Sequence, residues 1–404
     1  MRPSDSRPAA ASASALTTAA YISFVPIGIA NVLLGPLLPT LSARWSLNYA
    51  QAGALFTAQY IAGTVAVAWS GAVVSWRGYR FAMKSGILLM SAGLAVLLLG
   101  PKWLGVLSIA GYGGGIGIAV PAANLMVAEL NPARRAATLN WLNFYWSAGA
   151  VACPFLVAAA TRIQRMPLFL IVVSGFALIV AAGIHGMPAN LAEPASPAND
   201  RTKLVPLIRS QLRVFLILAV LFFIYVGTEN GFGGWVASFA RSLGSVSSAR
   251  SQITPSFFYA SLMLGRWLAP LLLRFDTEIR LVRIGLLLAC AGAAGLLSSH
   301  GWLGVVVSAC AAGLGLSYVY PITISLLSKE FGSASARIGS IMFVLANIGG
   351  GLLPWLVGLV SNRSGTLKTG LLIPLCGCAL MFGLYLRLRD WGPTQVRRGA
   401  LLDA

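Results

Sequence analysis

The chain has 404 residues, of which 57% are hydrophobic and only 10% are charged, and its formal net charge is +19 at pH 7. Its mean hydropathy of +0.80 is far outside the usual balance of a soluble domain, because no soluble core of this size can absorb so much apolar surface. The composition therefore excludes a soluble enzyme or binding module and indicates a polytopic membrane protein.

Apolar segments long enough to cross a hydrocarbon core of roughly 30 Å recur along the whole chain. Runs such as LAVLLLG and FALIVAAGIHG are apolar on every face, whereas the strands of a membrane barrel alternate between apolar and polar residues. The sequence therefore predicts an all-α membrane protein with twelve transmembrane helices, at residues 15–41, 51–76, 81–100, 103–128, 137–160, 166–186, 213–240, 254–273, 281–299, 302–327, 337–361 and 368–388.

The positions of the 29 basic residues explain the positive charge without a nucleic-acid partner. Twenty of them fall on the side of the membrane that holds the N-terminus, eight fall on the other side, and Arg266 lies inside a span. Because loops rich in Lys and Arg stay in the cytoplasm, the sequence predicts a multi-pass protein of the inner membrane with both termini cytoplasmic.

Two six-span blocks, at residues 15–186 and 213–388, are separated by a polar segment at 187–212 that we interpret as a cytoplasmic linker. We expect the Pro/Ala/Ser-rich residues 1–14 to be a disordered tail and residues 389–404 to be a cytoplasmic tail. Five motif residues recur at an offset of 200 positions, which predicts a tandem repeat whose halves share one orientation: Gly113, Gly115, Pro121, Gly149 and Pro154 match Gly313, Gly315, Pro321, Gly349 and Pro354.

The loop between the second and third spans reads GAVVSWRGYR at residues 71–80. With the duplicated twelve-span plan, it resembles the signature of the major facilitator superfamily, and the resemblance covers the full length. Gly71, Gly78 and Arg80 are in register with the signature, whereas Ser75 stands where the family carries Asp. The Gly265-Arg266 pair also resembles a family feature, in which Arg266 would anchor helix ends.

Polar side chains inside the spans are few, and they concentrate in the first, second, fourth and fifth spans of each half. Amides donate to and accept from hydroxyl groups and aromatic rings cover the apolar faces of a sugar ring, so the set predicts a mid-membrane site for a neutral polyhydroxylated solute, such as a hexose. The alternative for each amide is a hydrogen bond that only joins two helices. The candidate substrate-binding residues are Asn31, Gln59, Asn124, Asn143, Trp146, Glu229, Asn230, Trp235 and Asn347.

Residues 225–235 read YVGTENGFGGW and place Glu229 in a hydrocarbon stretch, where an ionisable group is costly and so indicates a functional site. The motif resembles the seventh span of the fucose/glucose/galactose permease branch, which implies sugar uptake driven by protons or, in some members, by sodium. That branch carries acidic residues in its first and fourth spans, where this chain has Asn31 and Asn124. We therefore expect Glu229 to carry the coupling proton; the alternatives are an internal salt bridge with Arg266, and a sodium-coupled or uncoupled sugar facilitator.

Other functions are less consistent with the sequence. A proton-coupled exporter of drugs or metabolites is the main alternative, but its fifth-span Gly-Pro signature is replaced by Ala152, Cys153 and Pro154. An enzyme is not expected, because His185 and His300 fall at opposite membrane faces and no carboxylate pair lies within the spans. We expect no cofactor and no metal, and a monomer in the lipid bilayer whose partners are a sugar and a coupling proton or sodium ion.

Charged residues that follow the fourth and tenth spans occupy equivalent loops of the two halves. Pairing between these loops would close the cytoplasmic side, although exposed pairs contribute only ~0–1 kcal/mol each and solvated helix ends are the alternative. The candidate gating residues are Glu129, Arg134 and Arg135 in the first half and Glu330 and Arg337, with Lys329, in the second.

Overall fold

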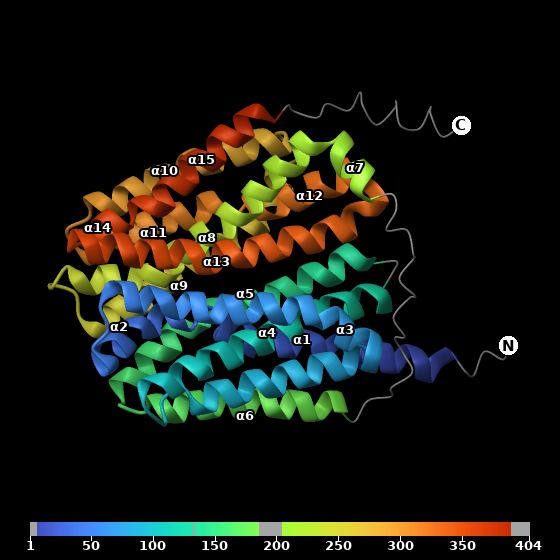
Figure 1. The fold of residues 1–404 in the computed structure, drawn as a ribbon, viewed down its shortest axis with the longest axis horizontal. Coiled ribbons are helices and arrows are strands. Elements are labelled where there is room, and N and C mark those ends of the chain that lie inside the picture. Colours follow the sequence, from blue (N-terminus) through green and yellow to red (C-terminus); the bar gives the residue numbers. More distant parts are fainter. Residues whose placement is uncertain (1–5, 132–133, 186–203, 389–404) are drawn as a thin grey trace.

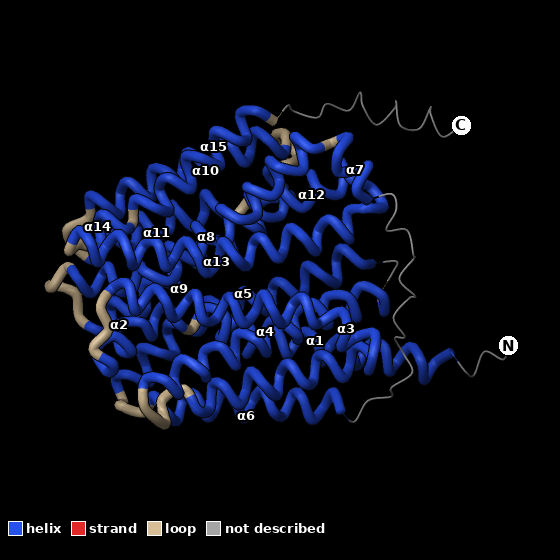
Figure 2. Tube along the Cα trace, in the orientation of Figure 1, coloured by secondary structure: helices blue, strands red, loops and turns tan. Residues whose placement is uncertain are grey.

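The computed structural model describes residues 6–131, 134–185 and 204–388, and the regular secondary structure in these ranges is entirely helical (Figure 2). Helices are expected here because a bilayer offers no water to satisfy backbone N–H and C=O groups. The first half contains α1 (Ser6–Val32), α2 (Leu34–Trp45), α3 (Tyr49–Val96), α4 (Lys102–Leu130), α5 (Arg135–Arg162) and α6 (Met166–His185).

The second half begins with the short helix α7 (Leu204–Ser210). Its remaining helices are α8 (Leu212–Ser242), α9 (Ser248–Leu272), α10 (Glu278–Ser298), α11 (Trp302–Leu316), α12 (Val319–Phe331), the 3-10 turn η4 (Gly332–Ala334), α13 (Ser335–Ser364), α14 (Leu367–Gly370) and α15 (Leu372–Arg387).

The described residues contain ten helical segments that are long and apolar enough to cross a membrane. One of them, the 48-residue α3, provides two spans, because Gly78 interrupts it with a φ of 79° and a ψ of 170°. The remaining span is α9, which has 25 residues but whose serine, glutamine and arginine residues lower its hydropathy. The predicted all-α fold with twelve transmembrane helices is confirmed.

Three spans are each interrupted four residues before a proline. A proline inside a helix removes one backbone hydrogen bond and clashes with the carbonyl four residues earlier. Pro36 lies four residues after the end of α1, Pro321 lies four residues after Ser317 between α11 and α12, and Pro374 lies four residues after the end of α14. The first, tenth and twelfth spans are therefore each built from two helices.

Helix α1 starts at Ser6 and so extends into the segment for which the sequence predicts a disordered tail. The run AAASASALTTAA is rich in alanine, the strongest helix former, and it continues a helix that the membrane already stabilises. The expectation of disorder is therefore wrong for residues 6–14. Residues 1–5, residues 187–203 of the predicted linker and the predicted tail at 389–404 lie outside the described residues.

The repeated glycines perform the same task in both halves. A Cβ at Gly113 would meet the backbone of Gln59, and a Cβ at Gly313 would meet the backbone of Phe258 at the equivalent point of the second half. Gly149 and Gly349 each face the backbone of the first span of their own half in the same way. These contacts require glycine because any side chain would push the helices apart.

The two halves form two groups of helices that lie side by side (Figure 1). Helices α1 to α6 form one group and α7 to α15 form the other. We call the end of the bundle where α1 begins and α15 ends the terminal end, and we call the opposite end, where α2 joins α3 and α8 joins α9, the distal end. The halves meet through α3 against α13, α5 against α9 and α2 against α8.

Candidate functional site

The contacts between the two halves gather toward the distal end, in a region that we call the distal seam. It consists of α3 residues Tyr49, Gly53, Phe56, Thr57 and Tyr60 with Gly35 of α2, and of α8 residues Gly233, Gly234 and Trp235 with α13 residues Gly350, Gly351, Trp355 and Gly358. Glycine is frequent on both sides, so the two backbones approach closely.

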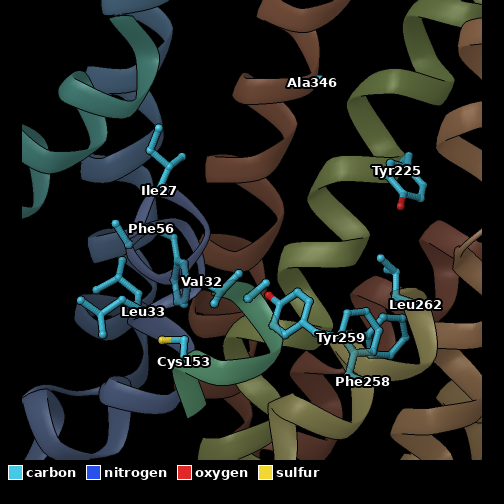
Figure 3. Close-up of a cluster of buried hydrophobic side chains, with 14 of the residues drawn as sticks. Ile27, Val32, Leu33, Phe56, Cys153, Tyr225, Phe258, Tyr259, Leu262 and Ala346 are labelled. Carbon is cyan, nitrogen blue, oxygen red and sulfur yellow. The ribbon is translucent and has the colours of Figure 1, made fainter. Parts of the chain in front are cut away.

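Hydrogen bonds also cross between the halves toward this end. The Thr57 hydroxyl donates to the Gly351 carbonyl at 3.3 Å, and the Ser256 hydroxyl of α9 donates to the Val151 carbonyl of α5 at 2.9 Å. Figure 3 shows Tyr259 reaching from α9 toward the first half, where Phe56 and Cys153 lie. The structure is therefore closed at the distal end.

The carboxylate of Glu229 lies on α8 just beyond this seam, and its residue is only 9% exposed. Its nearest cation is Arg266 of α9, whose Nη2 is 3.7 Å from Glu229 Oε2 and donates to the Tyr225 hydroxyl at 3.2 Å. The Tyr225 ring in turn stacks on Tyr320 with centroids 5.5 Å apart. The internal salt bridge that the sequence left open is thus present in the structure.

One donor of this group has no partner. The Nε of Arg266 is buried and has no hydrogen-bond partner among the described residues. A buried donor without a partner costs about 1–3 kcal/mol, and native structures hold few of them. The Glu229–Arg266–Tyr225 group therefore combines a carboxylate acceptor with a buried donor that no described residue satisfies.

Two further amides predicted for the site, Gln59 and Asn230, lie in opposite halves, and Asn31, which is also predicted, interacts with Gln59 through its backbone carbonyl. The Gln59 Nε2 donates to the Asn31 backbone carbonyl at 3.2 Å, and Gln59 Oε1 accepts from Tyr112 at 3.4 Å. Gln59 is therefore held in place between α1 and α4. Across the seam, Asn230 lies beside Gly350 and interacts with Tyr60.

Trp235 lies inside the distal seam in this conformation. Its Nε1 donates to the Pro354 carbonyl at 2.9 Å, and its ring packs against Tyr49 and Phe56 of the first half. The ring is only 1% exposed. Its contact with substrate remains a prediction.

The other candidate amides are oriented by their own helices. Asn124, Asn143 and Asn347 each donate through Nδ2 to the carbonyl four residues earlier, at 2.8, 3.0 and 3.1 Å. Asn143 is exposed and the other two are half-buried, as is Trp146. Whether these four residues line the substrate path remains a prediction.

Three tyrosines of the site are not among the candidate residues predicted from the sequence. Tyr60 of α3 lies near Glu229 and Asn230, and Tyr225 and Tyr320 surround Arg266. Tyr225 belongs to the YVGTENGFGGW motif and Tyr60 directly follows Gln59, so adjacency to selected residues was the available signal.

The predicted gate at the terminal end is unpaired between the halves as far as the described side chains show. Glu129 accepts from the Tyr79 hydroxyl of its own half at 2.6 Å, and Lys329 binds Glu278 of its own half at 2.7 Å. Arg134 is exposed and Glu330 half-buried, whereas the side chains of Arg135 and Arg337 lie outside the described part. Pairing across the halves belongs to a conformation closed at the terminal end, and it remains a prediction.

The family to which the chain belongs follows from its sequence. The sequence model of the Major Facilitator Superfamily matches residues 20–354. The chain belongs to the Major Facilitator Superfamily. Its architecture is accordingly the twelve-helix fold of this superfamily, and its activity is transport rather than catalysis. The superfamily signature loop occupies the kink of α3 at Gly78, as its position between two spans requires.

Individual superfamily members extend the comparison. The chain is 20% identical over 372 residues to the glucose/mannose transporter GlcP of Bacillus subtilis, and this match covers 86% of the chain and 88% of the relative. The nucleoside transporter NupG is similar in structure, with a TM-score of 0.77 and 14% identity over 92% of the chain and 99% of NupG. The fucose:proton symporter FucP of E. coli has a TM-score of 0.65 and 19% identity over 93% of the chain and 98% of FucP.

Proposed function

We propose that this superfamily member is a secondary active transporter that moves a small neutral polyhydroxylated solute, a hexose sugar, together with a proton. The observation that carries the proposal is the Glu229–Arg266–Tyr225 group, in which a nearly buried carboxylate lies 3.7 Å from a guanidinium that keeps one free donor. The site thus combines a proton acceptor with a hydrogen-bond donor for a hydroxyl.

The surroundings of this group suit a sugar. Tyr60 of the first half and Asn230 of the second half place a phenol and an amide beside Glu229, and such groups both donate to and accept from hydroxyls. Among the described residues, Arg266 is the one charged group that pairs with Glu229, so an ionic substrate is not required to balance charge. The similarity to a glucose/mannose transporter and to a fucose:proton symporter supports the same substrate class.

The Glu229–Arg266 ion pair couples sugar binding to proton binding in this proposal. When Glu229 is ionised, Arg266 is attracted to it and is less available to a ligand. Protonation of Glu229 removes that attraction and turns one carboxylate oxygen into a donor. A sugar hydroxyl then binds between the neutral acid and the freed guanidinium, so sugar and proton bind together.

The distribution of basic residues gives the proposed orientation in the membrane. The terminal end carries most of the Lys and Arg residues and is therefore the cytoplasmic side, and the distal end faces outward. Closure of the distal seam then makes this conformation the inward-facing one. Uptake requires the distal seam to open to the outside while the terminal end closes through the loops that hold Glu129 and Glu330.

Counterflow in proteoliposomes tests the substrate class. Vesicles preloaded with unlabelled solute are diluted into radiolabelled D-glucose, D-mannose, L-fucose or uridine, with empty vesicles as the control. We expect hexose counterflow and no uridine counterflow. Exchange of uridine without exchange of any hexose would refute the sugar proposal and favour a nucleoside carrier.

A further inference from the structure

A cavity of about 170 Å³ lies at the terminal end of the first half, away from the proposed sugar site. It lies between α1, α3, α4 and α6 and is lined on one side by apolar side chains such as Leu16 and Met126. Its polar lining is basic, because Arg80, Lys84 and His185 face it together with Arg77. None of the described residues that line it is acidic.

The basic side chains of this pocket are positioned by backbone and aromatic groups. Arg80 Nη2 donates to the carbonyls of Ile184 and His185 at the end of α6, at 3.1 and 3.0 Å, while its Nε is buried without a partner among the described residues. Lys84 Nζ lies 3.1 Å from His185 Nδ1. In the described part of the chain, neither arginine nor Lys84 forms an ion pair with a carboxylate.

In the equivalent loop of the second half, acidic residues pair with the basic side chains. At an offset of 199 residues, Asp276 stands where the first half has Arg77, and Glu278 stands where it has Tyr79. Asp276 binds Arg280 at 3.4 Å and Glu278 binds Lys329 at 2.7 Å. The first half has neither acid, and Ser75 replaces the acid of the superfamily signature. Its Glu129 accepts from Tyr79, and among the described residues no carboxylate pairs with Arg77, Arg80 or Lys84.

We propose that this basic pocket binds the phosphate group of an anionic phospholipid from the cytoplasmic leaflet. Arg77, Arg80 and Lys84 line the cavity and supply the donors, and basic pockets between membrane helices recognise such headgroups. A lipid rather than a free anion fits the position. Trp76, which is 71% exposed and stacks under Arg77 at 4.5 Å, is a residue type that marks the membrane interface, and the apolar wall of the pocket accommodates the first part of an acyl chain.

Native mass spectrometry of the full-length protein in detergent, with titrated phosphatidylglycerol, tests the proposal. The variant Arg77→Gln/Lys84→Gln removes two donors but keeps Arg80, which caps α6. Each basic group near a membrane surface contributes roughly 1 kcal/mol, or about fivefold, so we expect this variant to bind phosphatidylglycerol roughly 25-fold more weakly. The matched control Arg274→Gln/Arg280→Gln removes two charges from the equivalent loop of the second half and should bind as wild type does.

Three further arms distinguish other occupants. Phosphatidylcholine should bind weakly to all variants, and inorganic phosphate should not displace phosphatidylglycerol; displacement by phosphate at a similar concentration would assign the pocket to a free anion and overturn the lipid. The chain's own linker is another candidate occupant, because Glu193 and Asp200 follow α6 in the sequence. If lipid binds only to the variant Glu193→Gln/Asp200→Asn and not to the wild type, the linker occupies the pocket and the proposal fails.

A folding control keeps the test decisive. The melting temperature of each variant is measured without lipid, and if the double variant does not fold, the single variant Arg77→Gln replaces it, because this side chain is exposed. The single variant should bind phosphatidylglycerol about fivefold more weakly. Equal binding by wild type, the pocket variant and the control would overturn the proposal.

Discussion

Closure of the distal seam depends on residues that have no side chain, and Gly351→Val tests this directly. A Cβ at Gly351 would lie 2.9 Å from the Tyr60 Cβ and 3.4 Å from the Thr57 Cα of the opposite half. The first distance is shorter than packed carbon atoms allow, and valine adds two methyl groups beyond it. The substitution therefore penalises the conformation in which the distal end is closed.

The magnitude follows from the cost of overpacking, which is typically about 1–3 kcal/mol. The penalty applies only when α3 and α13 are in contact, so it shifts the equilibrium toward the distal-open conformation by roughly 5- to 150-fold. Replacing a helical glycine stabilises the helix itself by about 0.5–1 kcal/mol. The variant should therefore fold and change its conformation rather than unfold.

Spin-label distances report this shift. Labels on cysteines introduced at the exposed Ala43 and Ser245, in a background without the native cysteines, lie at the distal end of the two halves. Gly351→Val should increase the distance for most molecules. Gly383→Val is the matched control, because a Cβ at Gly383 meets nothing within 4 Å. Identical distance distributions for the two variants would refute the role of the seam.

Three further predictions concern packing and gating. Trp235→Phe leaves the Pro354 carbonyl without its 2.9 Å hydrogen bond, which should cost about 1–3 kcal/mol and lower the melting temperature; an unchanged value would contradict it. Gly349→Val forces a side chain against the Phe223 backbone and should reduce the folded yield strongly, whereas Gly175→Val, where a Cβ meets no atom within 4 Å, should not. Reversing the charges of Glu129 and Glu330 should increase accessibility of cysteine probes from the terminal end, and unchanged accessibility would rule out the gate.

The fold was predictable because the membrane imposes its constraints on the sequence directly. Apolar runs specify the spans, and the glycines recur at an offset of 200 because the same helix contacts recur in both halves. Even so, α1 begins at Ser6 because helix propensity continues beyond the apolar run, and hydropathy alone is a weak guide to a polar span such as α9.

The candidate site was predictable only in part. Glu229 stands out in any reading because a carboxylate in hydrocarbon is costly, but its pairing with Arg266 depends on how α8 packs against α9, which residue spacing does not reveal. The role of Tyr60 depends on contact between the halves and hence on the conformation. Asn124 and Asn143 show the opposite problem, since their amides bond within their own helices and sequence alone does not separate this from substrate binding.

Glu229→Gln provides the most direct test of proton-coupled sugar transport. In proteoliposomes, the variant keeps the shape and hydrogen bonding of the side chain but cannot take up a proton. We expect it to retain hexose counterflow and to lose hexose accumulation driven by an acid-outside pH gradient, while Glu229→Ala loses both. If Glu229→Gln concentrates hexose as well as wild type does, or if a sodium gradient alone drives accumulation, Glu229 is not the proton-coupling group.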